Sequence, residues 1–208
     1  MRNIWLTLAA FCLAAPLLGA APAARAADQG PAPTADDHIL GKADAPLTII
    51  EYASLTCPHC AEFARDTLPK IKQNWIDSGK ARLVFRVFPL NGVDVRAAMV
   101  ASCIPPDRYF NFIETVYKDQ DTWMNASDPV QAVANIGRLA GAGNDKIKSC
   151  LADKTLEEKV ISQGYAAQKD YGVDSTPTFF INGTKMNPNG AQPYEVFDKA
   201  LTAALPKS

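Results

Sequence analysis

The sequence contains no cluster of lysine or arginine, and its 21 basic residues are balanced by 22 acidic ones. Proteins that bind nucleic acid or anionic membranes generally carry such a cluster, so we expect neither kind of partner. Histidine and methionine are also scarce, with 2 and 4 residues, and only one pair of the 5 cysteines is closely spaced. A zinc site needs about four ligands, and copper sites favour methionine or extra histidine. We therefore expect no metal and no cofactor.

Long apolar stretches are missing except at the N-terminus. There, Arg2 precedes the apolar residues 4–18, and Ala24-Arg25-Ala26 has the small-x-small pattern of a cleavage site. We interpret residues 1–26 as a secretory signal peptide and residues 27–208 as one mature domain. Loss of the two arginines would change the formal net charge from −1 to −3. An uncleaved anchor is the alternative, which the shortness of the apolar segment disfavours.

Hydrophobic periodicity predicts an α/β fold. Residues 47–53 and 82–88 are apolar runs typical of buried strands, and the segment between them has helical periodicity. This order predicts a parallel strand–helix–strand unit with a right-handed crossover. Over about 93–171 the pattern is helical and indicates four or five helices. Strand character returns at residues 178–181, followed by an Asn182-Gly183 turn, a short strand and a final helix.

The most informative motif is Cys57-Pro58-His59-Cys60, between the first predicted strand and helix. Cys57 is expected at a helix N-terminus, where free backbone N–H groups and the helix dipole stabilise a thiolate. Pro58 suits the first helical position because no N–H is needed there, and a protonated His59 would add a positive neighbour. Cys60 lies one turn later and can close a disulfide with Cys57. The loop that this disulfide would close is so small that it gains little stability, and its geometry is strained. Because strained disulfides are the reactive ones, we interpret the pair as redox-active.

The chain resembles the disulfide-bond oxidoreductase A (DsbA) family of the thioredoxin superfamily. The resemblance is carried by Glu-Tyr-Ala-Ser-Leu-Thr-Cys-Pro-His-Cys at residues 51–60 and Thr-Pro-Thr-Phe-Phe-Ile-Asn-Gly at residues 176–183. It implies a thioredoxin fold with an inserted helical subdomain. It also implies a thiol:disulfide oxidoreductase in which Cys57 is the nucleophile and Cys60 the resolving thiol. An acidic nucleophilic cysteine is a known property of that family.

The resemblance assigns roles to three further residues. Glu51 is an acid inside an apolar strand, so it must be paired, protonated or functional. In the family a buried acid relays protons to and from the resolving thiol, here Cys60; the alternative is that Glu51 faces water at a strand edge. In thioredoxin folds the proline that matches Pro177 is cis and packs against the active disulfide. The backbone of its neighbour, Thr176, would pair with substrate as an added strand.

Cys103 and Cys150 are expected to form a second, non-catalytic disulfide within the helical insertion. Four cysteines remain after signal cleavage, and an even number in an exported chain suggests two disulfides. Some relatives of the family carry an extra pair in this region. The alternative is two unrelated buried thiols, because free cysteine packs like a small apolar side chain.

The resemblance implies a monomeric periplasmic enzyme that introduces disulfides into exported proteins. Its partners would be unfolded substrates with reduced cysteines and a membrane quinone-linked thiol oxidase that reoxidises it. Thr176 departs from the valine of well-known oxidases, and threonine there also occurs in disulfide isomerases. A monomeric isomerase or a dedicated thiol reductase therefore stays open. A non-enzymatic alternative is a periplasmic protein that handles Cu(I) through Cys57 and Cys60.

Overall fold

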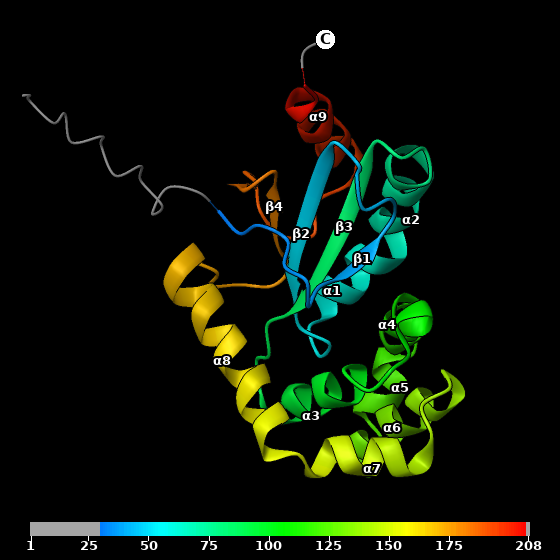
Figure 1. The fold of residues 1–208 in the computed structure, drawn as a ribbon. Helices are drawn as coiled ribbons and strands as arrows, with labels where there is room; N and C mark the ends of the chain where they lie inside the picture. Colours follow the sequence, from blue (N-terminus) through cyan, green and yellow to red (C-terminus); the bar gives the residue numbers. More distant parts are fainter. Residues whose placement is uncertain (1–29, 207–208) are drawn as a thin grey trace, which may run out of the picture.

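The computed structural model describes residues 30–206, and the predicted signal peptide, residues 1–26, lies outside them. A twisted sheet stands in the upper part of Figure 1, with helices against it and a group of helices below it. No helix in the described range is long and apolar enough to cross a membrane. The elements in chain order are β1 His38–Leu40, β2 Leu47–Ala53, α1 Pro58–Glu62, η2 Phe63–Thr67, α2 Leu68–Ile71, η3 Lys72–Ile76, β3 Ala81–Val87, α3 Gly92–Ala101, η4 Pro106–Arg108, α4 Tyr109–Lys118, α5 Gln120–Met124, α6 Pro129–Leu139, α7 Asn144–Ala152, α8 Lys154–Tyr171, β4 Thr178–Ile181, β5 Thr184–Lys185 and α9 Tyr194–Ala204.

The sheet has the strand order β1-β3-β2-β4-β5, so β2 lies in its centre. β2 and β3 are parallel, as predicted, whereas the other neighbouring pairs are antiparallel. Every residue of β2 is buried, which accounts for its nearly unbroken apolar sequence. Asn182 and Gly183 have φ of 47° and 81°, and this left-handed backbone makes the tight turn between β4 and β5.

Helices cover both faces of the sheet. On one face, α2 and α9 pack against alternate strand residues such as Ile49 and Phe179. On the other face, the C-terminal part of α8 packs near Ile50 and Phe180. Adjacent residues of a strand point to opposite faces, so a two-sided core requires the continuous apolar runs seen in the sequence. The carboxyl ends of β2 and β3 are left to meet the remaining helices.

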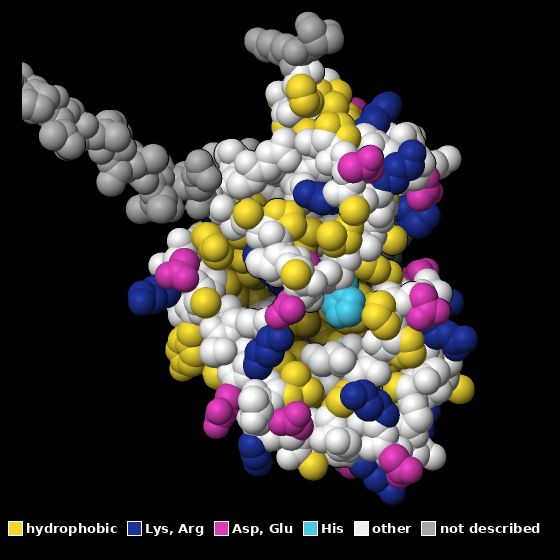
Figure 2. Space-filling model, viewed as in Figure 1, with side chains coloured by type: hydrophobic (Ala, Val, Ile, Leu, Met, Phe, Trp, Pro, Cys, Tyr) yellow, Lys and Arg dark blue, Asp and Glu magenta, His cyan; other side chains and the backbone are white. Residues whose placement is uncertain are grey.

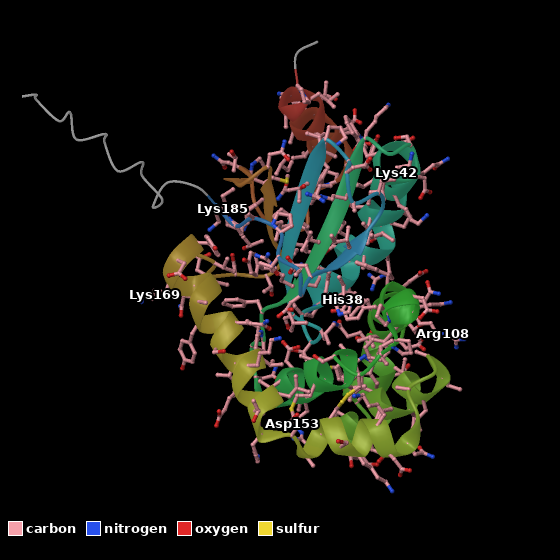
Figure 3. The ribbon with its side chains drawn as sticks, viewed as in Figure 1. His38, Lys42, Arg108, Asp153, Lys169 and Lys185 are labelled. Atoms are coloured by element: carbon pink, nitrogen blue, oxygen red, sulfur yellow. A yellow bond between two sulfur atoms is a disulfide. The ribbon has the colours of Figure 1, made fainter. Side chains whose placement is uncertain are left out.

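The helices α3 to α8 form the inserted helical subdomain between β3 and β4, and α8 extends from it onto the sheet (Figure 1). It contains six α-helices, more than the four or five expected. The extra boundaries fall at Asp119, between α4 and α5, and at Asp153, between α7 and α8, where no proline or glycine marks a break. Asp153, labelled in Figure 3, caps α8 by accepting a hydrogen bond from the Leu156 N–H at 3.0 Å. The fold class, a thioredoxin fold with an inserted helical subdomain, is confirmed.

β1 is a strand that the sequence did not predict. It has three residues, too few to show an alternating pattern, and it pairs antiparallel with the edge of β3. In this register His38 lies opposite Phe85, and its ring stacks on that of Tyr109 with centroids 3.5 Å apart. Tertiary packing therefore creates β1, because no local signal in the segment favours a strand.

Candidate active site

Cys57 and Cys60 lie where the chain leaves the carboxyl end of β2 and enters α1. Cys57 has the extended backbone of an N-cap residue, with φ −84° and ψ 122°, and Pro58 follows in the first turn of the helix. The Cys57 carbonyl accepts hydrogen bonds from the N–H groups of Cys60 at 3.1 Å and Ala61 at 3.2 Å. Both cysteines are free thiols in the structure, and their exposed fractions are 7% and 0%. Only Cys57 therefore presents surface to an incoming thiol.

The two thiols have opposite acid–base character. A hydrogen bond from the Cys60 thiol is the largest of the contributions that lower the pKa of Cys57, to about 5. Burial opposes this shift, while Thr176 and the backbone N–H groups of Cys60 and His59 add to it. Burial, followed by the bond to Cys57, raises the pKa of Cys60 far above that of a free thiol. At neutral pH the reduced site therefore holds a thiolate at Cys57 and a protonated thiol at Cys60.

His59 contacts Cys57 through its backbone N–H, and its ring lies next to Glu62. The ring is 73% exposed, and Nδ1 lies 3.2 Å from Oε2 of Glu62. The contribution of His59 to the acidity of Cys57 comes from its backbone N–H. Stabilisation of the thiolate by a protonated His59 side chain therefore stays a prediction, and in the structure the ring lies beside the carboxylate of Glu62.

We expect His59→Ser to raise the pKa of Cys57 by about one unit and to make the protein a weaker oxidant. Serine keeps the backbone N–H but removes a nearby side chain that can carry positive charge. The ultraviolet absorbance of the thiolate, followed against pH, measures this shift. A pKa identical to that of the parent protein would make the imidazole a spectator.

Glu51 is buried in the centre of the sheet, on the strand that leads to the dithiol. It is 2% exposed, and its Oε1 has no hydrogen-bond partner within the described residues. Burial raises its pKa to about 8, and its charge contributes to the raised pKa of Cys60. The alternative of a solvent-facing edge position is wrong, because β2 has neighbours on both sides. Glu51 is therefore an acid that holds a proton at neutral pH close to the resolving thiol.

Thr176 and Pro177 come to the dithiol from the far end of the chain, just before β4. Their peptide bond is cis. The Thr176 carbonyl lies 3.4 Å from Sγ of Cys57 and accepts a hydrogen bond from its thiol. Pro177 is buried, and Oγ1 of Thr176 has no hydrogen-bond partner within residues 30–206. The residues assigned to substrate binding and to nucleophilic attack therefore meet at one point.

Three residues of the helical subdomain that the sequence did not single out hold the loop before Cys57. Tyr117 donates its hydroxyl to the Ser54 carbonyl at 3.2 Å. The side-chain amide of Gln120 donates to the carbonyls of Leu55, at 2.8 Å, and Cys57, at 3.1 Å. The third residue, Asp94, also binds this loop. Nothing in the local sequence marks these polar residues, because their partners are backbone groups far away in the chain.

A disulfide joins Cys103, just after α3, to Cys150 in α7 (Figure 3). Their Cα atoms are 6.5 Å apart, within the usual range for a disulfide. The bond crosslinks the segment after α3 to α7, and neither cysteine lies at a strand-to-helix junction.

We expect Cys103→Ser combined with Cys150→Ser to destabilise the protein while thiol exchange at Cys57 continues. The closed loop spans a sequence separation of 47, worth on the order of 4 kcal/mol in the chain-entropy model. Thermal unfolding should show a melting temperature lower by roughly 10 °C. An unchanged melting temperature, or loss of dithiol oxidation, would contradict a purely structural bond.

A hollow of about 640 Å³ opens between the sheet edge and the helical subdomain (Figure 2). His38, labelled in Figure 3, stands at its rim, and Arg86, Tyr109 and parts of α8 also line it. Cys57 and Cys60 are not among its lining residues, so the candidate site is elsewhere. Within residues 30–206, no group of three or more His, Cys, Asp or Glu side chains is placed to hold a metal ion.

Comparison with known proteins gives consistent matches over most of the chain. A family model described as thioredoxin matches residues 33–203. Disulfide bond formation protein D of Bacillus subtilis (strain 168) is 30% identical over 156 residues, covering 69% of this chain and 67% of that protein. The solved structure of alpha-DsbA1 from Wolbachia pipientis has 33% sequence identity and a TM-score of 0.74, covering 83% of this chain and 92% of that chain. These matches span the sheet and the helical subdomain alike.

The lengths of the relatives differ from that of this chain. A relative from Rickettsia bellii (strain RML369-C) is 32% identical over 151 residues, which cover 72% of this chain but 58% of the relative. The chain thus spans less than three fifths of the length of that relative.

Proposed function

This chain belongs to the thioredoxin superfamily and, within it, to the DsbA family, and we propose that it is a periplasmic thiol:disulfide oxidoreductase that introduces disulfides into exported proteins. The observation that carries the proposal is the contrast between an acidic, reachable thiol at Cys57 and a buried, protonated thiol at Cys60. The name of the Bacillus subtilis relative, disulfide bond formation protein D, supports the same activity.

The reaction starts from the Cys57–Cys60 disulfide. A substrate thiolate attacks Sγ of Cys57, the bond between the two cysteines breaks, and Cys60 leaves with the electron pair. A second thiolate of the substrate then attacks the substrate sulfur of this mixed disulfide, and Cys57 leaves as a thiolate. The substrate loses two electrons and the enzyme dithiol gains them. Because the Cys57 thiolate is stabilised, the second step is favoured and the oxidised enzyme is a strong oxidant.

Glu51 supplies the proton that the first step requires. Cys60 leaves as a thiolate in a buried position, where a negative charge is costly. Glu51 retains its proton up to about pH 8 and lies close enough for its charge to affect Cys60. It donates this proton to Cys60 when the disulfide opens and takes a proton back when the enzyme is reoxidised.

The substrate polypeptide binds as an added strand along the backbone at Thr176. The Thr176 carbonyl lies 3.4 Å from the nucleophilic sulfur, so a chain paired there would carry its cysteine to Cys57. Such pairing recognises the substrate through backbone hydrogen bonds and not through side chains, which suits an enzyme that acts on many unfolded proteins.

The predicted signal peptide supports export to the periplasm, where disulfides persist. There, the protein acts as a monomer on unfolded chains with reduced cysteines. The family supports a membrane quinone-linked thiol oxidase as the partner. This oxidase would accept the two electrons of the dithiol and so restore the Cys57–Cys60 disulfide.

Thr176 favours a second candidate, a monomeric disulfide isomerase or a dedicated thiol reductase. The free hydroxyl of Thr176 can donate a hydrogen bond to the Cys57 thiolate and so lower the pKa of Cys57, which the side chain of valine cannot do. Two assays separate the candidates: oxidation of a reduced, denatured substrate protein, and rearrangement of the same protein with scrambled disulfides. We expect oxidation to be the faster reaction. Faster rearrangement of the scrambled substrate would replace the oxidase with the isomerase.

A further inference from the structure

A buried carboxylate from the helical subdomain binds the loop that leads to the nucleophile. Asp94, in the first turn of α3, has an exposed fraction of 0%. Its Oδ1 accepts a hydrogen bond from the Leu55 N–H and its Oδ2 from the Leu90 N–H, each at 3.0 Å. Leu55 lies two residues before Cys57, and Leu90 lies in the loop after β3. Asp94 thus ties the loop before Cys57 to the loop after β3.

A second link runs through the cap of the same helix. The Asn91 side chain accepts a hydrogen bond from the Asp94 N–H at 2.9 Å and donates one to Oγ1 of Thr56 at 3.0 Å. The start of α3 therefore contacts two consecutive residues before Cys57, namely Leu55 and Thr56. Movement of this helix terminus would therefore be transmitted by hydrogen bonds to the residues just before the dithiol.

The charge of Asp94 is not balanced by a cation. Both of its oxygens accept backbone N–H groups, as an ionised carboxylate does. Among residues 30–206, the ion pairs between basic and acidic side chains do not include Asp94. A negative charge buried without a counter-ion acts strongly on other charges nearby, because little water screens it.

We propose that Asp94 is a positioning residue that also limits the oxidising strength of the dithiol, because it fixes the loop before Cys57 and places a negative charge that disfavours the Cys57 thiolate. The inference rests on the proposed dithiol chemistry of Cys57 and Cys60. It assigns to the helical subdomain a direct part in setting the redox equilibrium.

The electrostatic interaction between the Asp94 carboxylate and the Cys57 thiolate is reciprocal. Burial raises the pKa of Asp94, and the charge of Cys57 raises it further. The charge of Asp94 also acts on Tyr117 in α4, whose pKa burial holds well above the ordinary value. Near neutral pH, Cys57 is therefore the neighbour whose charge changes between the oxidised and reduced protein.

Asp94→Asn tests the proposal, because asparagine keeps the shape of the side chain and removes its charge. We expect a lower pKa for Cys57 and at least a threefold smaller ratio of oxidised to reduced protein in a fixed glutathione buffer. Asp128→Asn is the matched control: Asp128 accepts the Gln131 N–H at 2.9 Å at the start of α6, and this variant should leave the ratio unchanged. A lower melting temperature for Asp94→Asn with an unchanged or larger ratio would overturn the proposal.

A second measurement needs no variant at this site. Carboxyl ¹³C NMR of the parent protein gives the titration midpoint of Asp94 in its oxidised and reduced forms. We expect a higher midpoint in the reduced protein, where Cys57 is a thiolate; equal midpoints would overturn the proposal. If oxidised glutathione does not form the Cys57–Cys60 disulfide, the proposed function fails as well. If the disulfide forms but the titration midpoint of Asp94 is the same in both forms, only the inference about Asp94 fails.

Discussion

Cys57→Ser is expected to abolish dithiol oxidation, reducing it to the uncatalysed rate. A serine hydroxyl cannot form the mixed disulfide, and the remaining thiol, Cys60, is fully buried and held in its protonated form. Oxidation of a reduced peptide with two cysteines measures the loss. Cys60→Ala is the matched variant: it keeps the nucleophile but should accumulate mixed disulfides through Cys57, visible on non-reducing gels.

Alkylation of the reduced protein gives an independent check on the same assignment. The pKa of Cys57 is about 5, so its thiolate predominates above that pH and is lost below it. Alkylation at mildly acidic pH should therefore label Cys57 first, and the rate should fall as the pH drops below about 5. Equal or preferential labelling of Cys60 would overturn the assignment of the nucleophile.

Glu51→Gln is expected to slow turnover by roughly a hundredfold while the redox equilibrium changes much less. Glutamine cannot hand a proton to the buried Cys60 thiolate, so opening of the disulfide loses its acid. Rapid-mixing kinetics across a range of pH, with the same reduced peptide, measure this effect. Oxidation kinetics equal to those of the parent protein at every pH would exclude the proton relay.

Thermal unfolding of Glu51→Gln and of the parent protein across pH shows whether the buried Glu51 carboxyl keeps its proton. The folded protein keeps the Glu51 proton up to about pH 8, whereas the unfolded chain loses it near pH 4.5. The parent protein should therefore lose stability as the pH rises through this window, by up to about 5 kcal/mol. Glu51→Gln should lack this loss; parallel stability curves for the two proteins would show that Glu51 ionises freely.

The sequence predicts the part of the fold that depends on local patterns. The parallel pair β2 and β3 and the turn at Asn182 and Gly183 follow from apolar runs and from residues with specific backbone preferences. β1 could not be predicted in this way, because a three-residue strand has no measurable period. The boundaries at Asp119 and Asp153 were missed for the related reason that no proline or glycine marks them.

The candidate site divides in the same way. Cys57 and Cys60 follow from their spacing and their position after a strand. The sequence left open whether Glu51 is buried or faces water, and the central position of β2 decides for burial. The orientation of the His59 ring toward Glu62 depends on side-chain packing that the motif does not specify. Asp94 was missed because it contacts backbone N–H groups 39 residues and 4 residues away, and a backbone group has no identity in the sequence.

The equilibrium of the Cys57–Cys60 pair with glutathione is the most direct test of whether this dithiol is an oxidant. A stabilised Cys57 thiolate favours the reduced protein, so the disulfide should form only in strongly oxidising buffers. The reduction potential should lie nearer to that of DsbA, about −120 mV, than to that of thioredoxin, about −270 mV. A potential as low as that of thioredoxin would contradict the proposed oxidase and indicate a reductase.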